Sequence, residues 1–393
     1  MFGDHLAAKT ALFVWEIGGG LGHVAPLAAV ARELTSRSDL KPVFILREPV
    51  FARRFLAGAG GPVLPAPVIP HHGEMRARGA SYAQTLVDNG YTRPGDLQLA
   101  VAAWHDLFGI FDPALIVADH APTAILAARG KIPVLGIGTG FTMPPDAMRE
   151  FPSLTKDVQP PVFQGQIREC INAVLKNLGQ PAIEHLPELL KCGARAVFSL
   201  PHLDPYGTIR NEKLLGHYES GLAPSPPEKN GVFFYSRSAE PRLELMVEGL
   251  AGSGLPISAY ITGADTAAKM FLKTRGATVF DDPPALADIL RESSLVVSHG
   301  GAGLTSAALQ VGRPQVILPI HVESEITALR IAALGSGMVV EDVEAGAVTE
   351  AVKTVSEVRL FQEHATAISE QIQQLGLPAN PPATAAEMAL NLI

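Results

Sequence analysis

The chain has 393 residues, of which 47% are hydrophobic and 18% are charged, a composition typical of a well-buried globular protein. This length is more than one ordinary core accommodates and predicts two domains of about 200 residues each. A net charge of −8 argues against a general nucleic-acid surface. Because runs of about 18 apolar residues are absent, we expect no membrane-spanning helix.

The N-terminus and the cysteines bear on the cellular setting. The first ten residues, MFGDHLAAKT, lack the basic start and the long apolar core of a signal peptide. Cys170 and Cys192 are too few for a disulfide framework or a four-ligand zinc site. A reduced, cytoplasmic setting is therefore expected.

Apolar stretches alternate with helical patterns along the chain. Strands are expected at 10–17, 41–48, 62–67, 115–120 and 133–141 in the first half, and at 231–237 and 295–297 among others in the second. Between them lie segments with helical spacing, and further helices are expected at 166–178 and 183–191. Such alternation predicts mostly parallel, doubly wound sheets, so the fold class is α/β.

Residues 206–230 are rich in Pro, Gly and Ser and are the best interdomain linker. We therefore predict an N-terminal domain over 1–205 and a C-terminal domain over 231–393. Two irregular stretches of the first domain, 68–96 and 142–164, are expected to be binding loops.

Two strands of this pattern run into a glycine turn that contains a histidine. The first turn, GGGLGH, ends at His23, and the second, SHGGAG, contains His299. Glycines at a strand-to-helix turn let a ligand approach the backbone, and the first N–H groups of the helix favour an anion such as a phosphate. The alternative is a tight turn with a packing histidine.

The stretch VVSHGGAGLTSAALQVGRPQVILPI, continued to Glu323, resembles the nucleotide-sugar signature of GT-B glycosyltransferases. It is most similar to the bacterial natural-product and UDP-glucuronosyltransferase-like branch. That resemblance implies two Rossmann-like domains facing a cleft, the first binding the acceptor and the second binding the nucleotide sugar, with the last helix crossing back onto the first domain.

Three positions depart from the family pattern. Leu304 stands where the family usually has Thr or Ser, and Ser324 replaces the usual Gln. Ala307 occupies a place where many UDP-sugar enzymes have a Glu for the ribose hydroxyls. A thymidine-type donor is therefore one hypothesis, and the nucleotide is expected to be of the UDP or dTDP type.

The resemblance implies a catalytic pair in the first domain. His23 matches the family's general base and Asp119 the acid that orients it. A histidine suits this task because its ordinary pKa lies near neutral pH. The alternatives are a helix-start histidine bonded to a carbonyl and a helix N-cap aspartate. Gly22, His120 and Trp104 are expected on the acceptor side.

Donor binding is expected to fall to the second domain. Ten residues match the family's donor site: Ser236, Arg237, Asp282, His299, Gly300, Gly301, Ala302, Gly303, Thr305 and Glu323. Arg237 can equally face solvent, and Glu323 can equally be a helix-start charge favoured by the helix dipole. The chain contains no D-x-D, so the reaction is expected to need neither a metal nor another cofactor.

The leading hypothesis is an inverting, metal-independent transfer of a sugar from a nucleotide diphosphate to a hydroxyl of a small or lipid-like acceptor. A cell-wall-type N-acetylglucosaminyltransferase is a related alternative, because GGGLGHVAP is close to its first loop. A non-catalytic partner subunit and an NAD-dependent oxidoreductase are the alternatives of other classes. The basic and apolar segment 50–58 adds a peripheral membrane contact as a subsidiary hypothesis.

Overall fold

The computed structural model describes residues 9–56, 58–70, 81–155, 164–219 and 221–393. It divides into two compact units, of which the first comprises Met1–Glu219 with Asn380–Ile393 and the second Ser220–Ala379. The chain thus forms most of the first unit, then the whole of the second, and its last residues return to the first. Each unit is built on one six-stranded parallel sheet with flanking helices.

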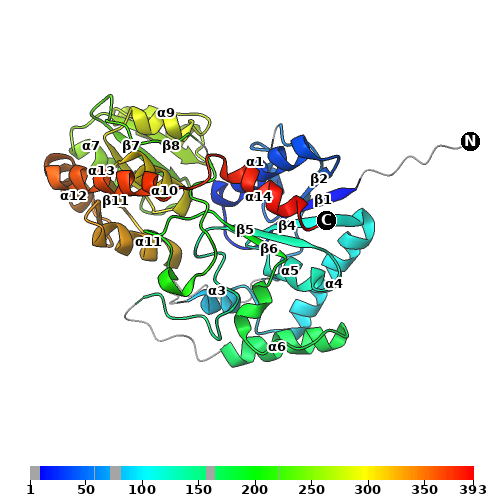
Figure 1. The fold of residues 1–393 in the computed structure, drawn as a ribbon. Coiled ribbons are helices and arrows are strands. Elements are labelled where there is room, and N and C mark those ends of the chain that lie inside the picture. Colours follow the sequence, from blue (N-terminus) through cyan, green and yellow to red (C-terminus); the bar gives the residue numbers. More distant parts are fainter. Residues whose placement is uncertain (1–8, 57, 71–80, 156–163, 220) are drawn as a thin grey trace, which may run out of the picture. The chain divides into compact units, whose positions relative to one another are not determined.

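The sheet of the first unit has the order β3-β2-β1-β4-β5-β6 (Figure 1). Its strands are β1 (Thr10–Trp15), β2 (Lys41–Leu46), β3 (Val63–Pro65), β4 (Pro113–Asp119), β5 (Val134–Gly138) and β6 (Ala194–Val197). Strand order reverses between β1 and β4, and open α/β sheets bind ligands at such a point, beyond the carboxyl ends of the strands. Trp15 pairs with Asp119 across this reversal.

Helices cover the two faces of this sheet. They are α1 (Leu21–Arg37), α2 (Pro49–Ala52), α3 (Tyr82–Asp88), α4 (Pro94–Phe111), α5 (Pro122–Ala128), α6 (Gln164–Asn177) and α14 (Pro381–Leu390), with 3-10 helices η1 (Leu186–Leu190) and η2 (Gly207–Ile209). In Figure 1, α1 and the red α14 lie side by side above the sheet, and α4 and α5 lie below it.

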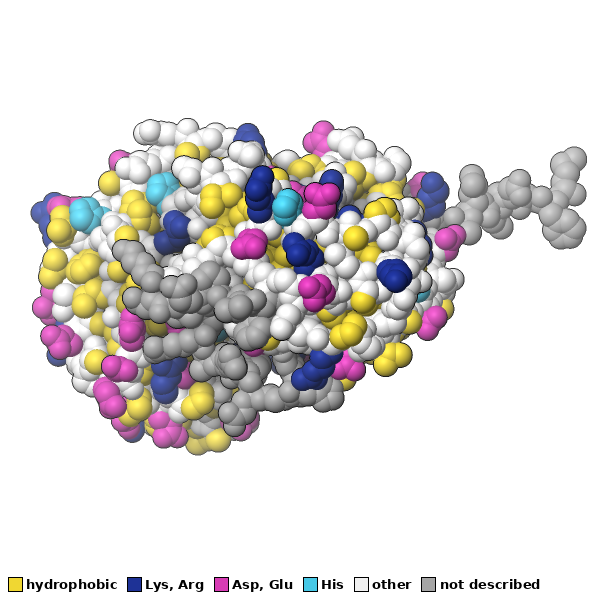
Figure 2. Space-filling view, turned by 90° about the horizontal axis from the view of Figure 1, so that it is seen from below, with side chains coloured by type: hydrophobic (Ala, Val, Ile, Leu, Met, Phe, Trp, Pro, Cys, Tyr) yellow, Lys and Arg dark blue, Asp and Glu magenta, His cyan; other side chains and the backbone are white. Residues whose placement is uncertain are grey.

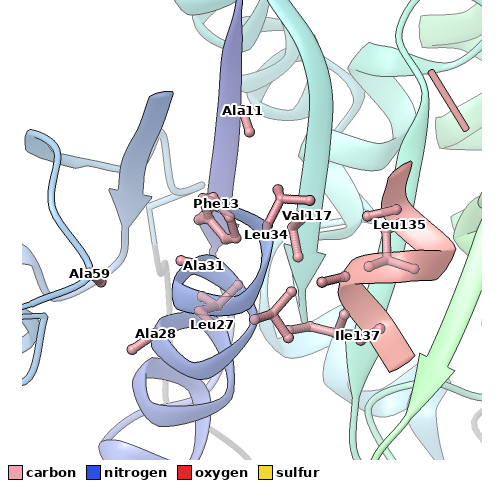
Figure 3. Packing of buried hydrophobic residues seen from close by; sticks show 14 of the residues in the cluster. Ala11, Phe13, Leu27, Ala28, Ala31, Leu34, Ala59, Val117, Leu135 and Ile137 are labelled. Atoms are coloured by element: carbon pink, nitrogen blue, oxygen red, sulfur yellow. The ribbon is translucent and has the colours of Figure 1, made fainter. Parts of the chain in front are cut away.

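The core between the sheet and α1 follows from the alternation of side chains along β1. Phe13 points toward α1 and is fully buried, as are Leu27 and Leu34 of that helix. Figure 3 shows Phe13 and Val117 from the strands beside Leu34 of α1. Burying one such side chain contributes roughly 1.5–3 kcal/mol. Three alanines of α14, Ala385, Ala386 and Ala389, complete the same cluster.

The second unit repeats the strand order in its own sheet, as β12-β11-β10-β7-β8-β9. Its strands are β7 (Val232–Arg237), β8 (Ile257–Thr262), β9 (Thr278–Val279), β10 (Leu295–Ser298), β11 (Gln315–Ile317) and β12 (Gly337–Val339). The helices are α7 (Leu243–Gly252), α8 (Thr266–Thr274), α9 (Leu286–Arg291), α10 (Ala302–Val311), α11 (Val322–Ala333), α12 (Ala345–Glu357) and α13 (Arg359–Gln374). Here the strand order reverses between β7 and β10.

The two doubly wound parallel sheets confirm the predicted fold class. The segment expected as a linker, 206–230, is divided between the units. Its first part is held in the first unit by the buried ion pair of Arg210 with Asp204, at 2.9 Å. Its last part is held in the second unit by Arg313, whose Nη1 donates to the Ser225 carbonyl at 2.6 Å.

Two local expectations need adjustment. The helix expected over 183–191 is only the 3-10 helix η1, because its start is fixed by a capping box of His185 and Glu188 and the chain is extended again at Lys191. The expected loops at 68–96 and 142–164 lie partly outside the described residues.

Charged side chains of opposite sign are mixed on the surface shown in Figure 2. On the described part of that face, Lys and Arg alternate with Asp and Glu among apolar patches. This mixture matches a chain with 31 basic and 39 acidic residues.

Candidate active site

The turn between β1 and α1 is shaped around the His23 ring. Gly18 has a left-handed backbone with φ +92°, and a Cβ at this position would lie 2.3 Å from His23 Nε2. A glycine is therefore required there both by conformation and by space. Gly20, with φ +84°, precedes the first residue of α1, and His23 stands in the first turn of the helix.

The structure brings together His23 and Asp119, the two residues that the family resemblance pairs. His23 Nδ1 lies 3.1 Å from Asp119 Oδ1, and their side chains are 13% and 2% exposed. The Trp15 indole stacks on the imidazole with ring centroids 5.1 Å apart. The carboxylate fixes one ring nitrogen and the indole fixes the ring plane, so the imidazole has a defined orientation.

Burial raises the pKa of Asp119, and the nearby His23 opposes this rise. The second carboxylate oxygen, Oδ2, is buried and accepts no hydrogen bond from any described residue. Asp119 therefore makes its hydrogen bond to His23 in a poorly solvated setting, where electrostatic interactions are stronger than in water.

His120, expected on the acceptor side, directly follows Asp119 in the chain. Its backbone is left-handed, with φ 45°, and its ring lies between those of His23 and Tyr82, at 5.7 and 5.6 Å. Neither ring nitrogen has a hydrogen-bond partner among the described residues. Burial lowers the pKa of His120 well below its ordinary value, so the ring is neutral at physiological pH.

The other two acceptor-side candidates differ in exposure. Gly22 is exposed in the first turn of α1. Trp104 is fully buried on α4 and packs against Phe108, with ring centroids 5.8 Å apart. The structure thus gives Trp104 a position in the core of the first unit.

Sequence reasoning missed Glu16. This carboxylate follows β1 and is only 3% exposed, and it accepts hydrogen bonds from the backbone N–H groups of Thr123 and Ala124. Burial, only partly offset by these bonds, raises the pKa of Glu16 to about 7. The available signal was an acidic residue inside an apolar run, TALFVWEI, since charges are rarely buried without a partner.

In the second unit, the turn between β10 and α10 presents backbone N–H groups. Gly300 has φ +81° and donates its N–H to the Ser298 hydroxyl at 3.1 Å. Gly301 is the N-cap of α10 and has no side chain with which to cap it. The first N–H groups of α10, from Ala302 onward, therefore lack helical acceptors and suit an anion.

His299 precedes these glycines and is held as a neutral ring. Its ring centroid lies 5.3 Å from that of Tyr235 and 6.3 Å from that of His321. Burial, with a smaller contribution from His321, lowers the pKa of His299 to about 4. Thr305, expected to meet a phosphate, is fully buried, and its hydroxyl bonds to none of the described residues.

The remaining donor candidates come from three other elements. Ser236 is buried and Arg237 is exposed at the end of β7, next to β10 at the reversal of strand order. Asp282 is exposed before α9, and Glu323 is partly buried in the first turn of α11.

The structure accounts for one departure from the family pattern. Ser324 is fully buried, accepts the N–H groups of Ile320 and His321 at 2.9 and 3.0 Å, and donates to the His321 carbonyl. With the His321 side chain it forms a capping box at the start of α11. Ser324 thus serves the fold of the turn. Ala307 is fully buried in α10.

Comparison with solved structures identifies the fold. The calicheamicin glycosyltransferase CalG4 matches with a TM-score of 0.70 and 20% identity over 98% of each chain. The chain has the GT-B fold. The spinosyn rhamnosyltransferase SpnG (TM-score 0.65, 16% identity, 98% of this chain and 100% of that one) and SnogD from Streptomyces nogalater (0.59, 18%, 98% and 99%) are further GT-B neighbours.

Sequence relatives point to the same group of proteins. Residues 281–387 match the family described as erythromycin biosynthesis protein CIII-like, C-terminal domain. The NDP-glycosyltransferase YjiC of Bacillus subtilis (strain 168) is 37% identical over 81 residues, 20% of each chain. The elloramycin glycosyltransferase ElmGT of Streptomyces olivaceus is 32% identical over 95 residues, 24% of each chain.

The matched segments span a fifth to a quarter of these two curated relatives. The expected resemblance to bacterial natural-product GT-B glycosyltransferases is confirmed. Among the described residues, no helix is both long and apolar enough to cross a membrane.

Proposed function

We propose that this GT-B protein is an inverting, metal-independent glycosyltransferase that moves a sugar from a nucleotide diphosphate to a hydroxyl of a small or lipid-like acceptor. The observation that carries the proposal is the hydrogen bond between His23 Nδ1 and the buried Asp119, at 3.1 Å, beside the reversal of strand order. The glycosyltransferases similar in sequence and in fold support it.

In the proposed reaction the acceptor oxygen attacks the anomeric carbon as the bond from that carbon to the diphosphate breaks. His23 takes the acceptor's proton. Because Nδ1 faces Asp119, Nε2 is the nitrogen assigned to the hydroxyl. Asp119 holds the ring in the required tautomer and stabilises the imidazolium, as a carboxylate does behind a catalytic histidine. One direct displacement inverts the anomeric centre.

The second unit supplies the groups that stabilise the leaving diphosphate. We assign this role to the first N–H groups of α10, to His299 as a neutral hydrogen-bonding ring, and to Arg237. Fixed N–H dipoles and a guanidinium compensate developing negative charge without having to reorganise. Glu323 is assigned to the hydroxyls of the donor sugar.

The acceptor side is assigned to the aromatic group around His120. Tyr82 contacts His120, Phe141 and Phe151, with ring centroids 5.0–5.9 Å apart. All four side chains are buried, and the apolar surroundings that they give this side favour an apolar or aromatic acceptor that carries the attacking hydroxyl. The cytoplasmic location and the peripheral membrane contact stay predictions.

The donor proposal is tested by thermal melting with UDP, dTDP, GDP, ADP and NAD, each without and with magnesium. A ligand that binds only the folded chain raises the melting temperature. At a ligand concentration of 100 times the Kd, the free energy of unfolding increases by about 2.7 kcal/mol. We expect stabilisation by UDP or dTDP without metal. Affinity for UDP matching or exceeding that for dTDP would remove the thymidine hypothesis based on Ala307.

The other outcomes separate the alternatives. Stabilisation by NAD alone contradicts the glycosyltransferase and supports the oxidoreductase, whereas no shift with any nucleotide supports a non-catalytic partner subunit. A nucleotide that binds only with magnesium contradicts the metal-independent reaction. Once a donor is found, the anomeric configuration of the product, read by NMR, tests inversion.

A further inference from the structure

Glu16 is a buried carboxylate that the proposed reaction does not use. It lies one residue beyond β1 and is 3% exposed. Its Oε2 accepts the Thr123 N–H at 2.9 Å, and its Oε1 accepts the Ala124 N–H at 2.7 Å. Each oxygen thus has one backbone donor, and a carboxyl group can accept at both of its oxygens.

These two N–H groups belong to the start of α5. Pro122, the first residue of that helix, has no N–H, and the N-cap Ala121 has no polar side chain. The N–H groups of Thr123 and Ala124 therefore come first among the helix donors that lack an acceptor within the helix. Glu16 satisfies both from another element, 107 residues before Thr123 in the chain.

The turn that precedes α5 needs such support. It consists of His120 and Ala121, between the end of β4 at Asp119 and the start of α5. His120 has a left-handed backbone, with φ 45°, which costs energy for a non-glycine residue. Ile17 donates its N–H to the His120 carbonyl at 3.1 Å. Glu16 and Ile17 thus bind the turn at both of its ends.

The same short segment also touches the catalytic pair. Trp15 pairs with Asp119 between β1 and β4, and its indole stacks on the His23 ring. The stretch from Trp15 to Ile17 therefore contacts the His23 ring, the Asp119 backbone and the turn that follows Asp119. A displacement of this turn would move the Asp119 carboxylate relative to the imidazole.

We propose that Glu16 is a positioning residue, whose carboxylate fixes the turn after β4 and so places Asp119 opposite His23. This inference rests on the proposed function for its effect on turnover, whereas its effect on the geometry of His23 and Asp119 does not. A misplacement of about 1 Å in such a pair is enough to slow an enzyme markedly.

The pH dependence of the stability that Glu16 contributes distinguishes a positioning role from a role in stabilising the fold. Burial raises its pKa from 4.5 to about 7, and its neighbours include the phenols of Tyr82 and Tyr91 and, at its own carbonyl, the Arg47 guanidinium. Because the folded pKa is the higher one, the stability that Glu16 contributes is present below pH 4.5 and is lost as the pH rises through 7. At pH 8 the ionised group is costly to the fold.

The test uses Glu16→Gln in the full chain, with Asn380→Ala as the matched control. Gln keeps the shape but can accept only one of the two N–H groups. Asn380 caps α14 in the same unit by accepting the Ala383 N–H, and its amide donates to Glu33 of α1, ten residues after His23. The first readout is the ring N–H signal of His23 in ¹⁵N-histidine NMR, identified by its loss in His23→Gln.

We expect Glu16→Gln to move the His23 signal toward its position in Asp119→Asn, and Asn380→Ala to leave it in place. We also expect kcat to fall about tenfold with an unchanged KM for the donor, and the melting temperature at pH 8 to fall no further than in the control. Glu16→Asp keeps the charge, but its side chain is too short to reach the Thr123 and Ala124 N–H groups. It should behave like Glu16→Gln, and it replaces that variant in the test if Glu16→Gln fails to fold.

An unmoved His23 signal in both Glu16 variants overturns the inference, as does an equal loss of kcat in the Asn380→Ala control. If the unaltered chain turns over no nucleotide sugar, the proposed function fails, while the NMR comparison still decides whether Glu16 places Asp119.

Discussion

The two glycine turns, 18–23 after β1 and 299–303 after β10, resemble each other in sequence and differ in what the neighbouring strand supplies. Each follows a buried strand at a reversal of strand order, and each holds a histidine. Beside the first turn, β4 ends in Asp119, which bonds to His23 at 3.1 Å. Beside the second, β7 ends in Ser236 and Arg237.

We infer that the glycine turn is a common support and that the neighbouring strand determines the chemistry proposed for each histidine. A carboxylate beside His23 suits the proposed role of this ring as the base. A hydroxyl and a cation near His299 suit a ring that stays neutral next to a negatively charged ligand, and the pKa of His299, lowered by burial to about 4, agrees with this. The two turns should therefore respond differently to matched substitutions.

The largest effect is expected at His23. His23→Gln removes the proposed base, and we expect turnover to fall by about 10³-fold, within the range for loss of general base catalysis. Stabilisation by the nucleotide should persist, because the proposed donor groups belong to the second unit. Steady-state kinetics and melting with the nucleotide check both parts. Activity within tenfold of the unaltered chain would show that His23 is not the base.

A smaller loss is expected for Asp119→Asn, about 10²-fold, at the lower end of the range for general base catalysis, because the proposed base remains but its tautomer and its charge are no longer supported. Burial raises the pKa of Asp119, so the neutral amide is tolerated by the fold and the melting temperature at pH 8 should not fall. Kinetics and melting on the same preparation separate the two effects. A loss of activity matched by a loss of folded protein contradicts the prediction.

Matched glycine substitutions compare the turns directly. Gly18→Ala and Gly300→Ala both place a Cβ on a left-handed residue, at a cost of roughly 1–2 kcal/mol. The new Cβ lies 2.3 Å from His23 Nε2 in the first and 2.7 Å from Ile317 Cγ2 in the second. We expect Gly18→Ala to lower kcat about tenfold and Gly300→Ala to weaken nucleotide binding instead. Equal effects on kcat from both variants would refute the division of roles.

The last prediction concerns stability and not turnover. Because the folded pKa of His299 is about 4 and its ordinary value is 6.5, the stability it contributes is complete above pH 6.5 and is lost as the pH falls toward 4. The difference is about 3 kcal/mol. We expect His299→Gln to flatten this acid limb in denaturant titrations. An unchanged pH dependence would show that the ring is not held neutral.

Much of the fold was predictable because local signals agreed with it. Apolar runs separated by helical patterns predicted the parallel sheets, and the glycine turns predicted that His23 and His299 follow the carboxyl ends of buried strands. The pairing of His23 with Asp119 came from the family resemblance, since their separation of 96 residues carries no local signal.

Other parts were not predictable because they depend on contacts between distant segments. Glu16 counted as one residue of an apolar strand, and only the packing of β1 beside the start of α5 shows its two hydrogen bonds. Ser324 counted as a departure from a donor motif, whereas its side chain caps α11. Trp104 was expected near the acceptor, and the register of α4 places it in the core.

The return of α14 to the first unit has a consequence for synthesis on the ribosome. The three buried alanines of α14 belong to the core between the first sheet and α1, so that core stays incomplete until residues 381–390 have emerged. The second unit is continuous in sequence and can close earlier. Although domains usually fold from the N-terminus onward, here the second unit is expected to finish first, with the nascent first unit exposing the apolar face of α1 to chaperones meanwhile.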